Sequence, residues 1–175
     1  PGSATVRVTD ALGQTADAAV TINAALAISP TTVNLLANGV QTFTGSGGVP
    51  TLSYSVVSGG GSINSSTGAF TAPASASTVT VRVTDFYGNT ADATANVYDT
   101  LTITPSTLTL ADGNVQNFAA AGGQAPYTFS VMSGNGTVDP SLGDYQAGAA
   151  GSDVVRVTDN LGFFVEAAVT VVDLP

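Results

Sequence analysis

The sequence predicts an all-β chain of tandem β-sandwiches arranged as a semi-rigid rod. The pentapeptide VRVTD occurs three times, at residues 6–10, 81–85 and 155–159. A second motif, Leu-x-Ile-x-Pro, opens at Leu26 and again at Leu101. Between these motifs, short alternating segments rich in β-branched residues are separated by clusters of Gly, Pro, Asn and Ser, which is typical of sandwich strands and their turns.

The spacing of the motifs divides the chain into three parts. Residues 1–25 match only the end of a repeat and are interpreted as the C-terminal hairpin of an incomplete repeat. Residues 26–100 and 101–175 are interpreted as two complete repeats, called here the second and third repeats. The linkers, at residues 24–25 and 99–100, are too short to permit free swivelling, which is why a semi-rigid rod is expected.

Each complete repeat is expected to contain seven short strands and no helix. In the second repeat these lie near residues 27–29, 32–36, 41–44, 52–57, 69–71, 78–84 and 90–97. In the third repeat they lie near residues 102–104, 107–110, 116–119, 127–132, 145–146, 153–158 and 164–171. Period-two alternation in LSYSV (52–56) and YTFSV (127–131) places their aromatic residues in a core rather than in a ligand-stacking surface.

The arginines of the three VRVTD motifs are the only basic residues in the chain. Three residues ending in glycine follow each motif, which suits a hairpin loop with its last residue in the left-handed region. Counting back from such a loop places Arg7 opposite Asp17, Arg82 opposite Asp92 and Arg156 opposite Glu166. These six residues are predicted to form structural cross-strand pairs. The alternative is that the three arginines bind an anionic ligand at regular intervals.

Composition excludes several functions. The chain has 3 basic and 12 acidic residues and a net charge of −9, which disfavours nucleic acid as a partner. It contains no histidine and no cysteine, so it lacks an imidazole base, a thiolate nucleophile and the common zinc ligands. Carboxylate pairs could serve a glycosidase, but most of the acids recur at equivalent repeat positions, so no enzyme is expected. No apolar run is long enough to insert into a membrane.

Calcium is the one cofactor left open. Asp99 lies near the end of a repeat and could converge with Asp85 or Asp112, but no run of the D-x-[DN]-x-[DN]-G type is present. The expectation is therefore a chain without cofactors, with calcium as a minor alternative.

The stretch SYSVVSGGGSINSSTGAFTAPASASTVTVRVTDFYGNTADATANV resembles the tandem immunoglobulin-like, cadherin-like repeats of large bacterial surface or secreted adhesin-type proteins. The matching motifs are Leu-x-Ile-x-Pro, Ser-Thr-Gly-Ala-Phe (66–70) and VRVTD with its following glycine. The resemblance implies immunoglobulin-like sandwiches, an extracellular or cell-surface location, and a role as a stalk or fibre module. It implies neighbouring repeats of the same or another chain as partners, and it transfers no catalytic residue.

Two further expectations concern binding. Phe86 and Tyr87 form a possible contact surface at a hairpin tip, for a glycan or a surface protein of a host or prey cell. The opening hairpin would expose Val6, Val8, Val20 and Ile22 unless something covers them. A neighbouring surface, a longer chain, or strands from another chain that join subunits into a polymer could each do so.

Overall fold

The computed structural model describes residues 1–173, and all the regular structure in this range is β-strand. This confirms the all-β expectation. None of these residues forms a helix that could cross a membrane. The chain divides into two compact units: residues 1–33, 38–73 and 77–96 form one, and residues 34–37, 74–76 and the chain from Val97 on form the other. The division at residues 25 and 100 stays a prediction.

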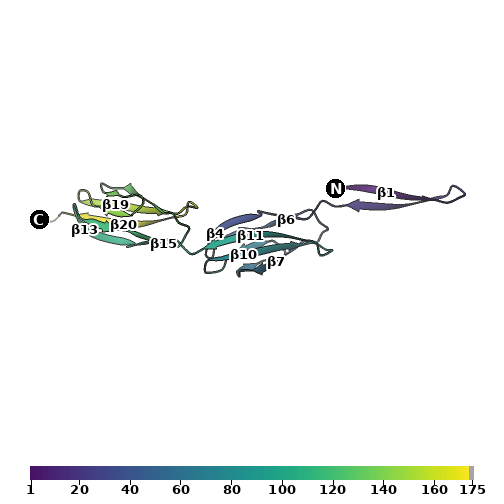
Figure 1. Ribbon diagram of the computed structural model, residues 1–175, viewed down its shortest axis with the longest axis horizontal. Helices are drawn as coiled ribbons and strands as arrows, with labels where there is room; N and C mark the ends of the chain where they lie inside the picture. Colours follow the sequence, from purple (N-terminus) through teal and green to yellow (C-terminus); the bar gives the residue numbers. More distant parts are fainter. Residues whose placement is uncertain (174–175) are drawn as a thin grey trace. The chain divides into compact units, whose positions relative to one another are not determined.

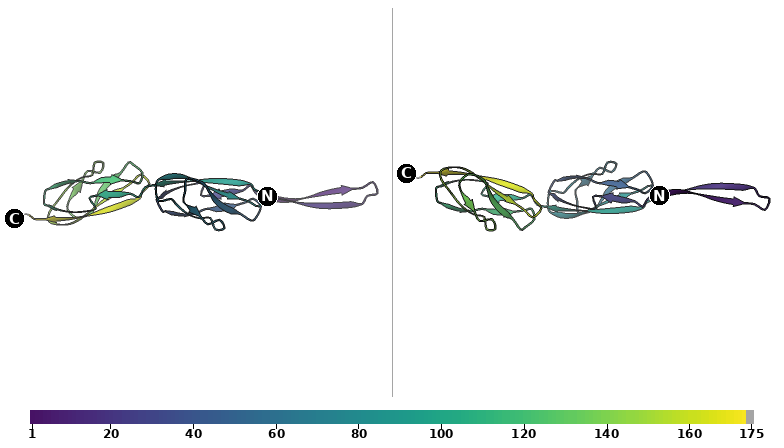
Figure 2. Two further views of the ribbon diagram at one scale, coloured as in Figure 1. Left: turned by 90° about the horizontal axis from the view of Figure 1, so that it is seen from below. Right: turned by 90° about the horizontal axis from the view of Figure 1, so that it is seen from above.

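The first part of the chain is a two-stranded antiparallel hairpin, β1 (Gly2–Thr9) and β2 (Thr15–Ile22). Its strands are drawn in purple in Figures 1 and 2. Arg7 lies opposite Asp17, and Val6 and Val8 lie opposite Ala18 and Ala16.

The second repeat is a two-layer arrangement of strands (Figure 1). Its main sheet has four strands in the order β4-β11-β10-β7, and two smaller sheets have the orders β3-β6 and β5-β9-β8. The strands are β3 (Ala27–Ser29), β4 (Thr32–Leu36), β5 (Val40–Thr42), β6 (Thr44–Ser46), β7 (Ser53–Ser58), β8 (Ser62–Ile63), β9 (Ala69–Thr71), β10 (Ser77–Thr84) and β11 (Thr90–Tyr98).

The third repeat has the same topology in the same strand order. Its main sheet is β13-β20-β19-β16, and the smaller sheets are β12-β15 and β14-β18-β17. The strands are β12 (Thr102–Thr104), β13 (Thr107–Ala111), β14 (Val115–Asn117), β15 (Ala119–Ala121), β16 (Thr128–Ser133), β17 (Thr137–Val138), β18 (Asp144–Gln146), β19 (Gly151–Thr158) and β20 (Phe164–Val172). Figure 2 shows the two layers of each repeat from opposite sides.

The single strands expected at residues 41–44 and 116–119 are wrong. Each is two short strands in different sheets, separated by one buried phenylalanine, Phe43 or Phe118. The backbone N–H of Phe43 donates to the Gly68 carbonyl, and that of Phe118 donates to the Gly143 carbonyl. Both acceptors lie outside the strands. The chain therefore changes sheets at the phenylalanine, which points into the core. The two-residue strands β8 and β17 also lie outside the strands expected from the sequence.

The closing hairpin of each complete repeat supplies much of its core. In the second repeat Val81, Val83, Ala93 and Ala95 are almost fully buried. Val155, Val157, Ala167 and Val169 are buried at the equivalent positions of the third repeat, in a cluster that includes Phe118, Phe129 and Tyr145. Alternate residues of these strands face inward, so the valines are inside and the arginines outside.

One matched pair of core positions is apolar in the second repeat and polar in the third. The second repeat has Phe70 and Val79, both buried, where the third has Tyr145 and Asp153. The Tyr145 hydroxyl donates to Asp153 Oδ2 at 2.6 Å. Burial, and then the adjacent Asp153 carboxylate, raise the pKa of Tyr145 above its usual value.

Asp153 also accepts hydrogen bonds from the backbone N–H groups of Asn135 and Gly136, at 3.1 and 2.7 Å. Only 1% of Asp153 is exposed. Three donors thus compensate its burial, as a carboxylate inside a core requires.

We expect Tyr145→Phe and Asp153→Val each to reduce the free energy of unfolding of the third repeat by about 1–3 kcal/mol, since each leaves buried polar groups unpaired. The double variant recreates the pair of the second repeat. It should therefore lose less than the sum of the two single losses, by about 1 kcal/mol or more. Urea unfolding followed by circular dichroism measures this, and strictly additive losses would show that the two side chains are not coupled.

Candidate functional site

The aspartate that ends VRVTD ties the hairpin tip to a distant loop in the second repeat. Asp85 Oδ1 accepts hydrogen bonds from the backbone N–H groups of Tyr87 and Asn89, at 3.0 and 2.8 Å. Its Oδ2 accepts from the N–H of Val49 at 2.9 Å and from the Asn89 side chain at 3.0 Å. Asp85 is 5% exposed, so the hydrogen bonds of its carboxylate are made to protein donors rather than to solvent.

The third repeat uses the same arrangement. Asp159 Oδ1 accepts from the N–H groups of Leu161 and Phe163, and Oδ2 accepts from the N–H of Gln124 at 3.0 Å. A backbone bond runs beside this tether, because the Asn160 N–H donates to the Gln124 carbonyl at 2.8 Å. In the second repeat the Phe86 N–H donates to the Val49 carbonyl in the same way, at 3.0 Å.

The first hairpin has only half of this arrangement. Asp10 Oδ1 accepts from the N–H groups of Leu12 and Gln14, at 2.9 and 2.8 Å, as its equivalents do. Within residues 1–173 no donor reaches Asp10 Oδ2, and the Ala11 N–H has no carbonyl partner of the Val49 or Gln124 kind. The local turn is therefore complete, while the long-range tether is not formed.

The structure places each arginine beside its predicted acid. Arg7 binds Asp17 with Nε and Nη2, both at 2.7 Å, and Arg82 binds Asp92 with the same atoms and distances. Arg156 donates twice to Glu166 Oε1, at 3.0 and 2.6 Å. These guanidinium groups are already paired within their own hairpins. They are therefore poorly suited to bind an anionic ligand.

Hydrogen bonds lower the pKa of three of the aspartates described above. The hydrogen bond from Arg82 lowers the pKa of Asp92, and that from Arg7 lowers the pKa of Asp17. The Asn89 side chain, and then the Val49 N–H, lower the pKa of Asp85. Since the folded pKa of Asp85 lies below its unfolded value of about 3.9, its stabilising contribution is complete above that pH and is lost as the pH falls through the folded value.

Phe86 and Tyr87 lie at the tip of the second repeat's closing hairpin. Their exposed fractions are 69% and 75%, and their rings meet edge to face with centroids 5.4 Å apart. The matching positions hold Ala11 and Leu12 in the first hairpin and Asn160 and Leu161 in the third repeat. An exposed aromatic pair is thus particular to the second repeat.

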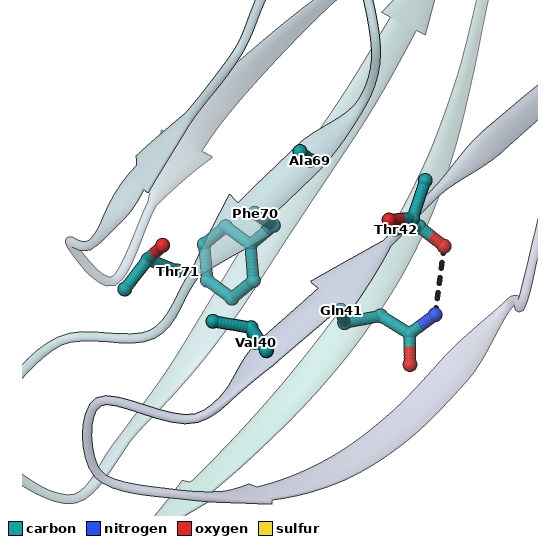
Figure 3. A pocket seen from close by; sticks show the side chains of 6 residues that line it. All are labelled: Val40, Gln41, Thr42, Ala69, Phe70 and Thr71. Carbon is teal, nitrogen blue, oxygen red and sulfur yellow. Dashed lines mark hydrogen bonds between the residues drawn. The ribbon is translucent and has the colours of Figure 1, made fainter.

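A shallow hollow lies along the edge strand β5 of the second repeat (Figure 3). It is lined by Val40, Gln41 and Thr42 of β5 and by Ala69, Phe70 and Thr71 of β9. The Gln41 side chain donates to the Thr42 carbonyl at 2.7 Å, and in the third repeat Gln116 donates to Asn117 in the same way. A hollow lines the equivalent edge there. In each repeat the glutamine side-chain amide binds a carbonyl of the edge strand, which makes that strand less able to pair with another chain.

The acidic residues weighed for calcium do not gather. Among residues 1–173 no group of three Asp or Glu side chains is placed to hold a metal ion. Asp85 is engaged as described, and Asp99 Oδ1 accepts a hydrogen bond from the Ala76 N–H at 2.8 Å.

The fold has a clear counterpart among solved structures. The C-terminal 282-residue fragment of intimin, crystallised in complex with the intimin-binding domain of the translocated intimin receptor (Tir), superposes with a TM-score of 0.64 and 16% identity. The match covers 89% of this chain and 64% of that chain, so this chain spans less than two thirds of the intimin fragment. At this identity the likeness confirms the tandem immunoglobulin-like fold and nothing about ligands.

Other likenesses are weaker. Mouse cadherin-23 EC22–24 matches with a TM-score of 0.36 and 14% identity, over 98% of this chain and 74% of that chain. The four N-terminal Ig domains of Dscam1 match with a TM-score of 0.39 and 14% identity, over 95% and 53% of the two chains. No protein-family model and no curated protein matches the chain.

The VRVTD aspartates recur at equivalent repeat positions, as the sequence indicated, but their long-range contact was not expected. The tether joins residues 85 and 49, and residues 159 and 124, which are far apart along the chain. The sequence does repeat an aspartate before each of these loops, although the glycine of the loop could form the turn without it. This repetition was the available sign that the aspartate has a second role. The partner of the aspartate in that role is a backbone N–H, which leaves no trace in the sequence.

We expect Asp85→Asn to lower the melting temperature of the second repeat by about 5–15 °C. The substituted amide would place N–H donors against the Val49 N–H and the Asn89 side chain, where a carboxylate oxygen now accepts. Differential scanning calorimetry measures the shift. Asp10→Asn is the matched control and should leave the transitions of both complete repeats within about 2 °C, since Asp10 makes only the local turn contacts. Equal effects of the two variants would contradict a role for the tether.

Proposed function

We propose that this chain is a non-catalytic structural stalk or fibre module of a bacterial cell-surface or extracellular adhesin-like protein. The observation that supports this most directly is how the ends of a repeat are joined. In the third repeat β13, near the start, pairs in parallel with the last strand β20 along five residue pairs. In the second repeat β4 and the last strand β11 are neighbours in the same sheet order.

This pairing suits a module that bears tension. A force on the two ends of the third repeat pulls β13 from its N-terminal end and β20 from its C-terminal end. Because these strands are parallel, the force slides one along the other and loads their hydrogen bonds together. The bonds of an antiparallel hairpin pulled apart at its open end break one after another, at a lower force.

The polar contacts support the same function. The arginines pair with acids of their own hairpins, and Asp85, Asp159 and Asp153 bind backbone N–H groups. Within residues 1–173 no buried side-chain nitrogen or oxygen lacks a hydrogen-bond partner. Groups committed to folding in this way are not available for catalysis. Repeated structural contacts of this kind are expected of a scaffold whose partners are neighbouring immunoglobulin-like repeats.

Pulling the chain by its two ends should require roughly twofold more force, or higher, to unfold the third repeat than pulling it by handles on Ser152→Cys and Thr170→Cys. Ser152 and Thr170 lie opposite each other across the antiparallel β19–β20 pair, so that second geometry peels one strand from the other. Single-molecule force spectroscopy measures both, and the absence of native cysteine makes the handles unique.

The parallel clamp itself can be tested with one backbone bond. The Asp112 N–H donates to the Val172 carbonyl at 3.1 Å. Asp112→Pro removes this donor and should lower the end-to-end unfolding force, whereas the matched control Asp112→Ala keeps the donor and should not. Equal forces in the two pulling geometries would contradict a load-bearing role.

A second function is favoured by the exposed Phe86–Tyr87 pair, namely a carbohydrate- or protein-binding module of a secreted protein. Adjacent aromatic rings with open faces can stack on sugar rings or anchor a protein interface. The intimin fragment with the same fold was crystallised with a receptor domain, so a fold of this kind is compatible with protein binding.

Glycan and surface-protein arrays probed with the chain test this second function. The Phe86→Ala, Tyr87→Ala double variant should lose at least about tenfold in binding, because hot-spot aromatics dominate such interfaces. Leu161→Ala, at the tip of the third repeat, is the matched control and should bind as the unaltered chain does. Binding that survives the double variant would exclude this surface.

A further inference from the structure

Among residues 1–173 three aromatic side chains are exposed, and they differ in whether a cation covers the ring. In the third repeat the guanidinium group of Arg156 lies over the ring of Phe164, with Cζ 4.1 Å from the ring centroid. No cation lies over Phe86 or Tyr87 in the described part of the chain. All three arginines pair with acids of their own hairpins, so the chain has no basic side chain left for this ring pair.

The loop that carries this pair also holds a negative charge without a counter-charge. The carboxylate of Asp85 accepts four hydrogen bonds, from backbone N–H groups and from the Asn89 side-chain amide, and all of these donors are uncharged. None of the ion pairs within residues 1–173 includes Asp85. The second repeat as a whole has three aspartates and one arginine. Its field therefore attracts a cation to the tip and opposes an anion.

The angle between the two rings favours a compact cation over a sugar. The planes of Phe86 and Tyr87 are inclined at 66°, with their centroids 5.4 Å apart. The flat face of a sugar needs a flat aromatic surface, and it can lie against only one of two rings inclined in this way. An ammonium or guanidinium group is small enough to contact the faces of both rings, where the π-electrons concentrate negative charge.

The backbone presents the ring pair in a fixed position. The Phe86 N–H donates to the Val49 carbonyl and the Tyr87 N–H donates to Asp85 Oδ1, both at 3.0 Å. Little backbone freedom is therefore lost when a partner binds, which lowers the cost of association. The third repeat builds the same loop with Asn160 and Leu161 in place of the rings, so it provides a matched tip without an aromatic pair.

We propose that the Phe86–Tyr87 pair is a docking site for a lysine or arginine side chain presented by a partner protein. The cation lies against the faces of both rings, and the Asp85 carboxylate of the same loop adds to its attraction. This rests on the second function proposed above and deepens it, because it names the partner of the same surface as a basic protein rather than a neutral glycan.

The probe is a short synthetic peptide of alternating glycine and lysine, added to the full chain and followed by nuclear magnetic resonance. We expect the largest changes in chemical shift at the resonances of Phe86 and Tyr87. A peptide of alternating glycine and glutamine is the matched neutral probe and should leave these resonances unchanged. Binding of the lysine peptide should weaken as salt is added, since salt screens the field of the tip.

Variants of the tip separate the rings from the general negative charge of the chain. Phe86→Leu combined with Tyr87→Leu keeps apolar side chains and the backbone bonds of the loop but removes the π faces. It should weaken binding of the lysine peptide about twofold to fivefold, without changing the unfolding transition of the second repeat. Leu161→Ala, at the tip of the third repeat, is the matched control and should bind as the unaltered chain does.

Trimethylation of the lysines in the peptide tests the nature of the contact. It keeps the positive charge but removes the N–H donors, so a peptide bound by the ring faces should still bind. Loss of binding on trimethylation would overturn the proposal in favour of a salt bridge to a carboxylate. Equal binding to the unaltered chain and to the double leucine variant would overturn it in favour of a general attraction to the acidic chain.

Further outcomes distinguish this proposal from the binding function on which it rests. If the lysine peptide does not bind, while the Phe86→Ala, Tyr87→Ala variant abolishes binding to a neutral glycan, the proposal fails and the binding function stands. Phosphatidylcholine vesicles that bind through the same two rings would overturn the proposal in favour of a lipid surface. If no probe depends on the two rings, the proposal and the binding function both fail.

Discussion

The register of the closing hairpin is the constraint on which each repeat depends. Side chains alternate along a strand, so a slip of one residue would turn Val81 and Val83 outward and bring Arg82 into the core. A three-residue loop sets this register: the Asp85 N–H bonds to the Asn89 carbonyl and the Gly88 N–H bonds back to Asp85. Gly88 has a φ of 85°, a conformation that glycine adopts without strain. The Asp85 carboxylate then holds the same loop from within.

The hairpin also organises the rest of the repeat. It forms the centre of the main sheet, and its inward valines meet the aromatic residues contributed by the smaller sheets. The aspartate at its tip reaches a loop that precedes the flanking strand, so one residue links the hairpin turn, the loop and the sheet edge. With no disulfide available, these packed and hydrogen-bonded contacts hold a small domain together.

Comparison of the two complete repeats separates what this architecture requires from what it tolerates. The edge-to-face aromatic pair recurs as Phe43–Phe70 and Phe118–Tyr145, with ring centroids 5.9 Å apart in both. The position facing it holds either Val79 or Asp153, and the charged version is accommodated by the Tyr145 hydroxyl and two backbone donors. The core therefore accepts different chemistry where every polar atom finds a partner. The residues at the hairpin tips vary more between the copies, and Phe86 and Tyr87 of the second repeat have no aromatic counterparts at the other tips.

The all-β class, the repetition and the pairing of each arginine with an acid follow from the sequence alone, because local periodicity and the length of a hairpin loop specify them. The sequence also indicated which alternate residues would face a core. Tertiary structure alone decided that Phe43 and Phe118 switch the chain between sheets, that Asp85 and Asp159 bind loops distant in sequence, and that Asp153 is buried. Each of these depends on backbone groups or on contacts between remote segments. Such partners have no side-chain pattern, so they become visible only when the chain is folded.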